Sequence, residues 1–225
     1  MVYITGDIHG DLDRFKQKAA KKLKKNDYLI VCGDFGFIWD NSKKEKQILK
    51  WLGKRRYKIL FVEGAHDNLR LLGEYPAVDY CGGKARQISG NLYQLIRGYV
   101  FNIDSLNIFA FGGGESSDSD VRELGVTWFE DELPTQAELE LARQNLERCR
   151  GVVDYIVTHE STANIKSFLD MQNKTNARIH HLNAFFEDVA KNCRFKKWYF
   201  GAYHADKIIP PCYHAVFKDI VPINK

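Results

Sequence analysis

Short apolar runs alternate with helical stretches through the first third of the chain, and this rhythm constrains the fold more than any other feature. Strand-like runs at Val2–Ile4, Tyr28–Cys32 and Ile59–Val62 are separated by helical stretches at 11–25 and 43–54. The βαβαβ order predicts parallel strands joined by right-handed crossovers. The carboxyl ends of such strands lie along one edge of the sheet, where ligands bind in open α/β folds. The segments that directly follow the strands are therefore the first place to look for chemistry.

The middle of the chain predicts a second sheet. Runs at 99–103 and 107–111, joined by Asp104-Ser105-Leu106, are typical of a β-hairpin. Pro134 and Thr135 then indicate a capped start for a helix that extends to about residue 150, and a strand follows at 155–157. With 225 residues and 44% hydrophobic content, the sequence favours one α/β domain spanning 1–225.

The composition indicates the cellular compartment more clearly than the binding partner. Five cysteines without a CxxC pair favour a reducing cytoplasm, and neither an export leader nor an apolar run of bilayer length is present, so we expect a soluble cytoplasmic protein without a membrane partner. The net charge of +4 is compatible with phosphate-bearing substrates. Lysines crowd residues 16–25 as in a nucleic-acid stripe, but no aromatics are interleaved, which favours a solvated helix face. Nucleic acid is therefore a possible but not the favoured partner, and the oligomeric state is not predicted.

Aspartate or histidine follows five of the strand-like runs. The five segments are Gly6-Asp7-Ile8-His9-Gly10, Gly33-Asp34, Gly64-Ala65-His66-Asp67, Thr158-His159 and Gly201-Ala202-Tyr203-His204. Taken singly, each is better explained as a capping aspartate or a structural histidine. Their recurrence at successive strand ends favours a shared site, and carboxylate with imidazole is a donor set that suits manganese, iron or zinc.

The series resembles the signature GDxH, GD, GNH(D/E), H, GHxH of the calcineurin-like metallophosphoesterase superfamily, in its bacterial or phage-type form, from Asp7 to His204. The resemblance implies an α/β fold, a four-layer αββα sandwich of two mixed β-sheets flanked by helices. It further implies that the metal ligands are Asp7, His9 and His204 for one ion, Asp34 for both ions and His159 for the second. His66 would be the catalytic proton donor to the leaving group.

The implied activity is hydrolysis of phosphomonoesters or phosphodiesters by a hydroxide that bridges two divalent metal ions. The ions would be Mn, Fe, Zn or Ni, with Mn favoured. The substrate would be a phosphate ester, with a nucleotide as one candidate. Because loops outside the signature choose the leaving group, the sequence leaves its identity open.

Two positions depart from the family pattern. Ala65 stands where the signature has asparagine, and Ala202 where it has histidine. Both family residues would be ligands of the second metal, and a methyl group donates no lone pair. Only Asp34 and His159 would then hold that ion, so we expect the second metal to be weakly bound or absent and the activity to be impaired. Both losses fall on one metal, which favours selective inactivation over random decay.

Two alternatives stay open at this point. The first is a nucleotide phosphodiesterase or nuclease of the same fold, and the second is a catalytically degenerate binding or scaffold protein. A protein phosphatase is disfavoured, because Gly33-Asp34 continues as Phe35-Gly36-Phe37 and lacks the DxxDR arginine of that branch. Arg70, Arg97 and Arg122 could contact phosphate, but none is singled out.

Overall fold

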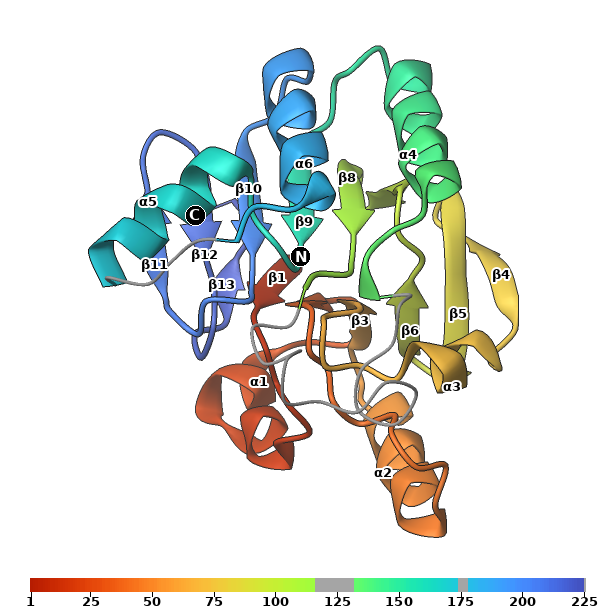
Figure 1. Cartoon of the computed structure of the whole chain (residues 1–225). Helices are drawn as coiled ribbons and strands as arrows, with labels where there is room; N and C mark the ends of the chain where they lie inside the picture. Colours follow the sequence, from red (N-terminus) through yellow and green to blue (C-terminus); the bar gives the residue numbers. More distant parts are fainter. Residues whose placement is uncertain (116–131, 174–177, 225) are drawn as a thin grey trace.

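The computed structural model describes residues 1–115, 132–173 and 178–224, and it places two mixed β-sheets face to face (Figure 1). The first sheet has the order β13-β1-β2-β3-β6-β5-β4 and the second the order β11-β12-β10-β9-β8-β7. Strands β1, β2, β3 and β6 are mutually parallel in the first sheet, as are β8, β9, β10 and β12 in the second. The prediction of an α/β sandwich with two mixed sheets is therefore confirmed.

The strands of the first sheet are β1 Val2–Thr5, β2 Tyr28–Cys32, β3 Lys58–Val62, β4 Ala77–Tyr80, β5 Gly83–Ser89, β6 Leu92–Leu95 and β13 Val221–Pro222. Those of the second are β7 Tyr99–Ile103, β8 Leu106–Phe111, β9 Tyr155–Thr158, β10 Lys197–Phe200, β11 Lys207–Ile209 and β12 Tyr213–Ala215. The helices are the 3-10 helix η1 Leu12–Lys16, α1 Lys18–Lys22, α2 Lys43–Gly53, α3 Leu69–Gly73, α4 Gln136–Arg148, α5 Ala163–Asn173 and α6 His181–Asn192.

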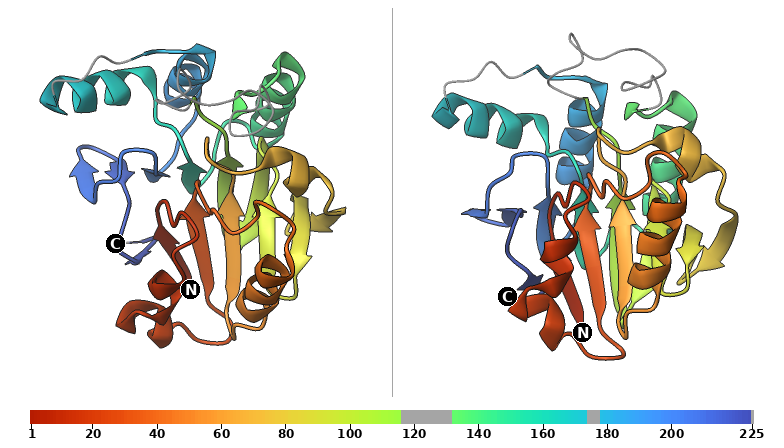
Figure 2. Two further views of the ribbon diagram at one scale, coloured as in Figure 1. Left: turned by 60° about the horizontal axis from the view of Figure 1, so that its bottom comes forward. Right: turned by 90° about the horizontal axis from the view of Figure 1, so that it is seen from below.

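Alternation along the strands divides the apolar side chains among three layers. Ile30 of β2 and Val157 of β9 belong to the cluster between the two sheets. Val31, the next residue in β2, faces the opposite way and packs with residues of η1 and α2. Ile156 of β9 packs with residues of α4 and α6 in a third cluster. Because successive side chains of a strand point to opposite faces, each sheet is covered on both sides, which gives the four layers seen in Figures 1 and 2.

Several local predictions are confirmed. The hairpin of β7 and β8 turns at Asp104 and Ser105, whose φ angles of 52° and 63° fit a two-residue type I′ turn. Helix α4 begins with a capping box in which Thr135 and Glu138 bond to each other's backbone amides.

Other elements differ from the sequence prediction. The single helix predicted over 11–25 is wrong, because an extended Gln17 separates η1 from α1. The break lets both Phe15 and Leu23 pack against the first sheet. Strands β4 to β6 were not predicted, and β4 has no buried residue whose apolar alternation would reveal it. In the described part of the chain, no helix is long and apolar enough to cross a membrane.

Candidate metal centre

All five predicted metal ligands and His66 lie just beyond the carboxyl ends of strands. Asp7 and His9 follow β1, Asp34 follows β2 and His66 follows β3. From the second sheet, His159 follows β9 and His204 lies beyond β10. Two groups of these side chains bring ligand atoms within 4.8 Å of one another: His9, Asp34 and His204, and Asp7, Asp34 and His159. The two sheets thus build one cluster, with Asp34 common to both groups.

The first half of the cluster presents donor atoms to a common point. The Nε2 atoms of His9 and His204 are 2.9 Å apart, and His9 Nε2 lies 3.7 Å from Asp34 Oδ2. His204 Nε2 lies 3.9 Å from Asp7 Oδ2. Two imidazole nitrogens that face each other share at most one proton between them when both rings are neutral, so this arrangement leaves ligand lone pairs directed inward. Burial lowers the pKa of His9 against the opposing effect of the Asp34 and Asp7 charges, which favours its neutral, metal-binding form.

Asp7 provides a direct test of whether a cation fits this half. Its side chain is buried, and Oδ2 has no hydrogen-bond partner among the described residues. Its other oxygen, Oδ1, accepts a hydrogen bond from the backbone N–H of Ala202 at 3.2 Å. A buried carboxylate oxygen without a donor is costly unless a cation satisfies it. The donor set of Asp7, His9, Asp34 and His204 therefore fits a divalent ion of the manganese, iron or zinc type.

The second half of the cluster contains fewer donors. His159 Nε2 lies 3.7 Å from Asp34 Oδ1, while its Nδ1 lies 3.1 Å from the carbonyl oxygen of Cys32 and 3.3 Å from Asp7 Oδ1. Nδ1 can donate to that carbonyl, which directs Nε2 towards Asp34. Ala65 and Ala202 lie in the loops after β3 and β10, and their methyl side chains offer no ligand atom. If Asp7 serves the first ion, the described residues leave Asp34 and His159 for the second, which is too few to hold an ion well without water or substrate.

The ionisable side chains of this half shift one another's pKa values. Burial alone would lower the pKa of His159, but the carboxylates of Asp34 and Asp7 raise it to about 10. Burial would likewise raise the pKa of Asp34, but His159 and His66 hold it well below the ordinary value of a carboxyl group. The buried carboxylates of Asp34 and Asp7 thus favour positive charge in this half of the cluster.

His66 sits at the rim of the cluster with a side chain that is 39% exposed. Its backbone N–H donates to Asp34 Oδ1 at 2.8 Å, and its ring Nδ1 lies 2.9 Å from Asp34 Oδ2. Because an ionised carboxylate only accepts, Nδ1 is the donor in this pair. The bond orients the ring at a solvent-accessible edge, as expected of a group that transfers a proton to substrate.

The backbone is held in unusual conformations at the cluster. His9, Asp34, Ala202 and His204 all have positive φ, between 45° and 61°. Left-handed backbone is unfavourable for residues other than glycine, and it concentrates where function over-determines the local structure. Gly33 is required beside them, because a Cβ there would collide with the imidazole of His159.

Asp67 is a supporting residue whose role the sequence analysis missed. It is buried, and its carboxylate accepts hydrogen bonds from the backbone N–H groups of Phe35 at 3.1 Å, Gly36 at 2.8 Å and Gly64 at 2.9 Å. These bonds join the loop after β2, which carries Asp34, to the loop after β3. Burial and the nearby charge of Asp34 raise the pKa of Asp67 to about 7. Its position directly after His66 was the only sequence signal.

Arg14 supports the cluster from the other side and was also missed. Its guanidinium is buried and donates to Thr5 Oγ1 at 2.8 Å, to the carbonyl oxygen of Asp7 at 3.3 Å and to that of Phe217. Phe217 in turn stacks on the ring of His204, with 4.8 Å between ring centroids. The end of β1 and the segment after β12 are thus fixed relative to each other.

Of the arginines weighed from the sequence, Arg97 is engaged by another partner. Arg97 is 6% exposed, and its Nε lies 2.5 Å from Glu63 Oε1, which assigns it to a buried ion pair. Arg70 lies in the last turn of α3, and Arg122 falls outside the described residues.

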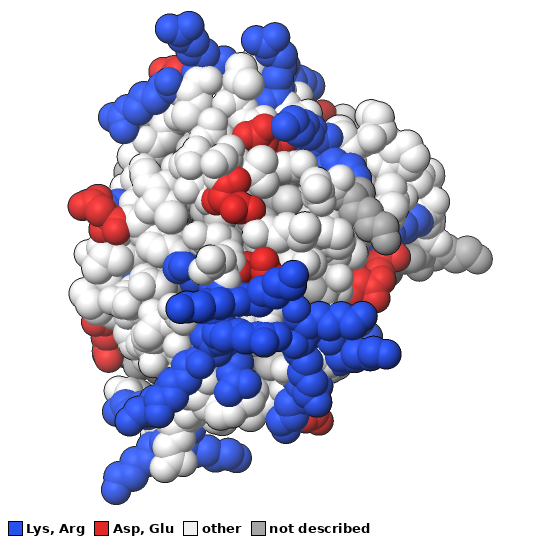
Figure 3. Space-filling view, turned by 180° about the vertical axis from the view of Figure 1, so that it is seen from behind, with Lys and Arg blue, Asp and Glu red and all other residues white. Residues whose placement is uncertain are grey.

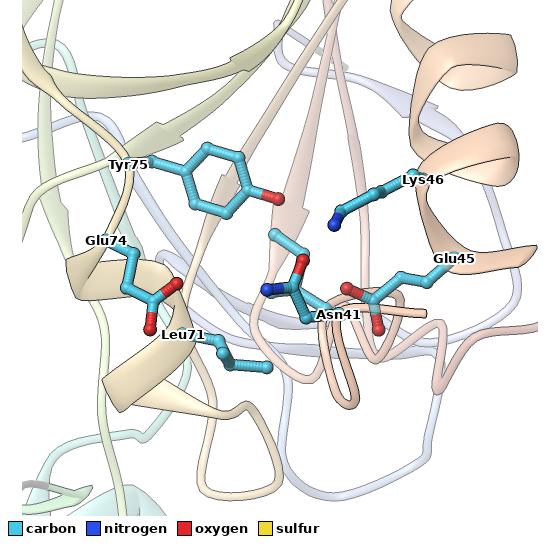
Figure 4. Close-up of a pocket in the computed structure, with 7 residues that line it drawn as sticks. Asn41, Glu45, Lys46, Leu71, Glu74 and Tyr75 are labelled. Carbon is cyan, nitrogen blue, oxygen red and sulfur yellow. The ribbon is translucent and has the colours of Figure 1, made fainter. Parts of the chain in front are cut away.

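One described cavity is lined by none of the predicted ligands. It measures about 210 Å³ and lies between α2 and the segment from α3 to Tyr75, where Glu74 and Tyr75 face Glu45 and Lys46 (Figure 4). This cavity is therefore separate from the metal cluster.

Comparisons with known proteins agree with this geometry. A search among curated proteins finds no match. The family model described as calcineurin-like phosphoesterase matches residues 1–208, and this range includes every member of the cluster. Since the match covers most of the 225 residues, the chain belongs to the calcineurin-like phosphoesterase family.

Proposed function

We propose that this chain is a phosphoesterase with one complete metal site, formed by Asp7, His9, Asp34 and His204, and one depleted site, formed by Asp34 and His159. The family is a metal-dependent one, and the observation that carries the proposal is the pair of donor groups that share Asp34, one with His9 and His204 and one with Asp7 and His159, together with the unsatisfied Oδ2 of buried Asp7. We favour Mn²⁺ as the ion, because mixed carboxylate and imidazole ligands suit it.

Divalent ions bound there would activate the attacking water and polarise the phosphoryl group as Lewis acids. The chain's own residues would arrange the rest of the reaction. Asp34 holds the His66 ring through Nδ1, so that a protonated His66 would present Nε2 to the oxygen of the departing alcohol. The buried side chains of Asp7, Asp34 and His159 keep water from the inner side of the cluster, and the more exposed His9, His66 and His204 line the side that a phosphate ester would approach.

The proposal includes impaired turnover, because Ala65 and Ala202 supply no donor to the second site. The substrate class is a phosphomonoester or phosphodiester, and a nucleotide or oligonucleotide is the alternative within the same chemistry. We further propose that residues 1–225 act as one domain and that the protein is cytoplasmic, which the five free thiols support.

A degenerate scaffold is the second candidate, and the two alanines are the observation that favours it. Against it, all donors of the first half persist, and four cluster residues retain left-handed backbone, which costs stability that a scaffold does not need.

A substrate panel with a matched variant tests the proposal. Mn²⁺-loaded protein is assayed on p-nitrophenyl phosphate, bis-p-nitrophenyl phosphate, cyclic nucleotides and oligonucleotides. We expect metal-dependent hydrolysis of at least one, and loss of about 10²- to 10⁴-fold in kcat for His66→Gln on esters with poor leaving groups. His180→Gln, outside the cluster, is the control. Absence of hydrolysis together with normal metal binding would favour the scaffold.

A further inference from the structure

The charge of this protein is distributed very unevenly. Residues 16–58 contain fourteen lysines and arginines but four aspartates and glutamates, a net +10, so that the rest of a chain with net +4 carries −6. Three of the four acidic residues, Asp27, Asp34 and Glu45, are buried. The solvent-facing charge of this segment is therefore almost entirely positive.

The fold collects these cations on one face. Helices α1 and α2 both belong to the layer that covers the outer side of the first sheet. Arg56 joins them, because its Nε donates to the carbonyl oxygen of Leu23 at 2.6 Å and its Nη2 to that of Lys21 at 2.8 Å. Figure 3 shows the resulting concentration of blue side chains on the lower half of the rear face, where α1 and α2 lie. We call this surface the basic layer: Lys16, Lys18, Lys21, Lys22, Lys24, Lys25, Lys43, Lys44, Lys46, Lys50, Lys54, Arg55 and Arg56.

Acidic partners are scarce in the basic layer. Lys16 pairs with Asp13 at 2.8 Å, but within the described ranges no carboxylate lies at ion-pair distance from Lys21, Lys22, Lys24 or Lys25. Elsewhere the chain does compensate its cations, as in Lys196 with Asp154 at 2.7 Å. A solvated helix face usually interleaves both signs, since like charges repel each other. An uncompensated face of this size favours a polyanionic partner.

A groove within the basic layer adds an aromatic contact that the sequence of α1 alone did not show. It measures about 270 Å³, lies between η1 and α2, and is lined by Leu12, Lys16, Lys44, Gln47, Ile48 and Trp51. The guanidinium of Arg55 lies 3.8 Å from the centroid of the Trp51 ring. Cations beside an indole form the combination that contacts phosphates and stacks on bases.

We propose that the basic layer binds nucleic acid through its phosphates. A membrane surface fits less well, because basic helices that bind lipid also present large apolar side chains. In the described part of the chain, the exposed large apolar residues are Met1, Trp39, Val152, Phe168, Met171, Ile179 and Ile208, and none belongs to α1 or α2. The inference goes beyond the proposed function, since it needs neither a metal ion nor turnover.

Fluorescence anisotropy with a labelled single-stranded RNA of about 20 nucleotides, in EDTA and over a series of salt concentrations, tests this binding. The variant Lys22→Glu/Lys50→Glu alters one exposed lysine in each helix. Its control, Lys191→Glu/Arg194→Glu, makes the same change in net charge on exposed residues at the end of α6. Melting curves establish that both variants fold.

We expect the wild type to bind with a steep salt dependence, the Lys22→Glu/Lys50→Glu variant to bind at least tenfold more weakly with a shallower slope, and the control to change less than threefold. No binding by the wild type, or equal weakening in both variants, would overturn the proposal. So would binding to phosphatidylserine-containing vesicles without binding to RNA. Hydrolysis of small esters by Lys22→Glu/Lys50→Glu should be unchanged, which separates this test from that of the metal site.

Discussion

The two halves of the strand-end cluster differ in donor atoms although they share one framework. Around Asp7, His9 and His204, donor atoms lie close together, and the buried Oδ2 of Asp7 has no hydrogen-bond partner among the described residues. Around His159, the loops carry Ala65 and Ala202, whose methyl side chains offer no ligand atom, and among the described residues Asp34 and the shared Asp7 are the nearby donors. The loop after β10 nevertheless keeps a left-handed backbone at Ala202, with φ of 61°, as it does at His204, with φ of 48°. The geometry of such a site is thus encoded in the loops, and its metal content in a few side chains.

Restoring the missing donors should have the largest effect. With Ala65→Asn and Ala202→His, the second half regains two ligands, and kcat for the best substrate should rise about 10³-fold, because a bound ion contributes several kcal/mol of transition-state stabilisation. Steady-state kinetics in Mn²⁺ measures this. Ala65→Asn with Ala202→Phe is the matched control, since phenylalanine fills similar space without a donor atom. Equal activity of the restored and unaltered proteins would remove the assigned difference between the halves.

Removing a donor from the complete half should have the next largest effect. Asp7→Asn replaces the charged oxygen that lacks a protein partner, and the affinity for the first Mn²⁺ should fall about 100-fold or more. Isothermal titration calorimetry measures the change. Asp13→Asn, at an exposed carboxylate that pairs only with Lys16, should bind Mn²⁺ as the unaltered chain does. Unchanged affinity in Asp7→Asn would place the ion elsewhere.

The framework that both halves share can be weakened separately. Asp67→Asn leaves at least one of three backbone N–H groups without its acceptor, so the free energy of unfolding of the metal-free protein should fall by about 2 kcal/mol at pH 6. Because the pKa of Asp67 is raised, its ionised form is disfavoured in the folded protein, and urea denaturation should show a smaller loss at pH 8 than at pH 6. With Asp13→Asn we expect a change below about 0.5 kcal/mol. A similarly small change in Asp67→Asn would mean that the two loops do not depend on this carboxylate.

The sequence predicted the parts of the molecule that obey short-range rules. The βαβαβ rhythm indicated a parallel sheet, and strand-end residues such as Asp34 and His159 indicated a shared site at its edge, while the sandwich and the ligand roles came from the family resemblance. The supporting roles of Asp67 and Arg14 were not predicted, because they depend on backbone groups of distant segments, such as Gly36 and Phe217, that no local sequence pattern brings together. Strand β4 was not predicted because it has no buried face. The break at Gln17 was not predicted because tertiary packing outweighs helical propensity there.

The basic layer illustrates the same limit. The lysines of α1 alone favoured a solvated helix face, and only the fold places those of α2 and the indole of Trp51 beside them.

The most direct test of this account is the manganese content and position in crystals of the unaltered chain grown with Mn²⁺ and measured at the manganese absorption edge. The account predicts one strong anomalous peak bounded by Asp7, His9, Asp34 and His204, with little or none beside His159. Two peaks of equal height, or a peak away from these four residues, would contradict it.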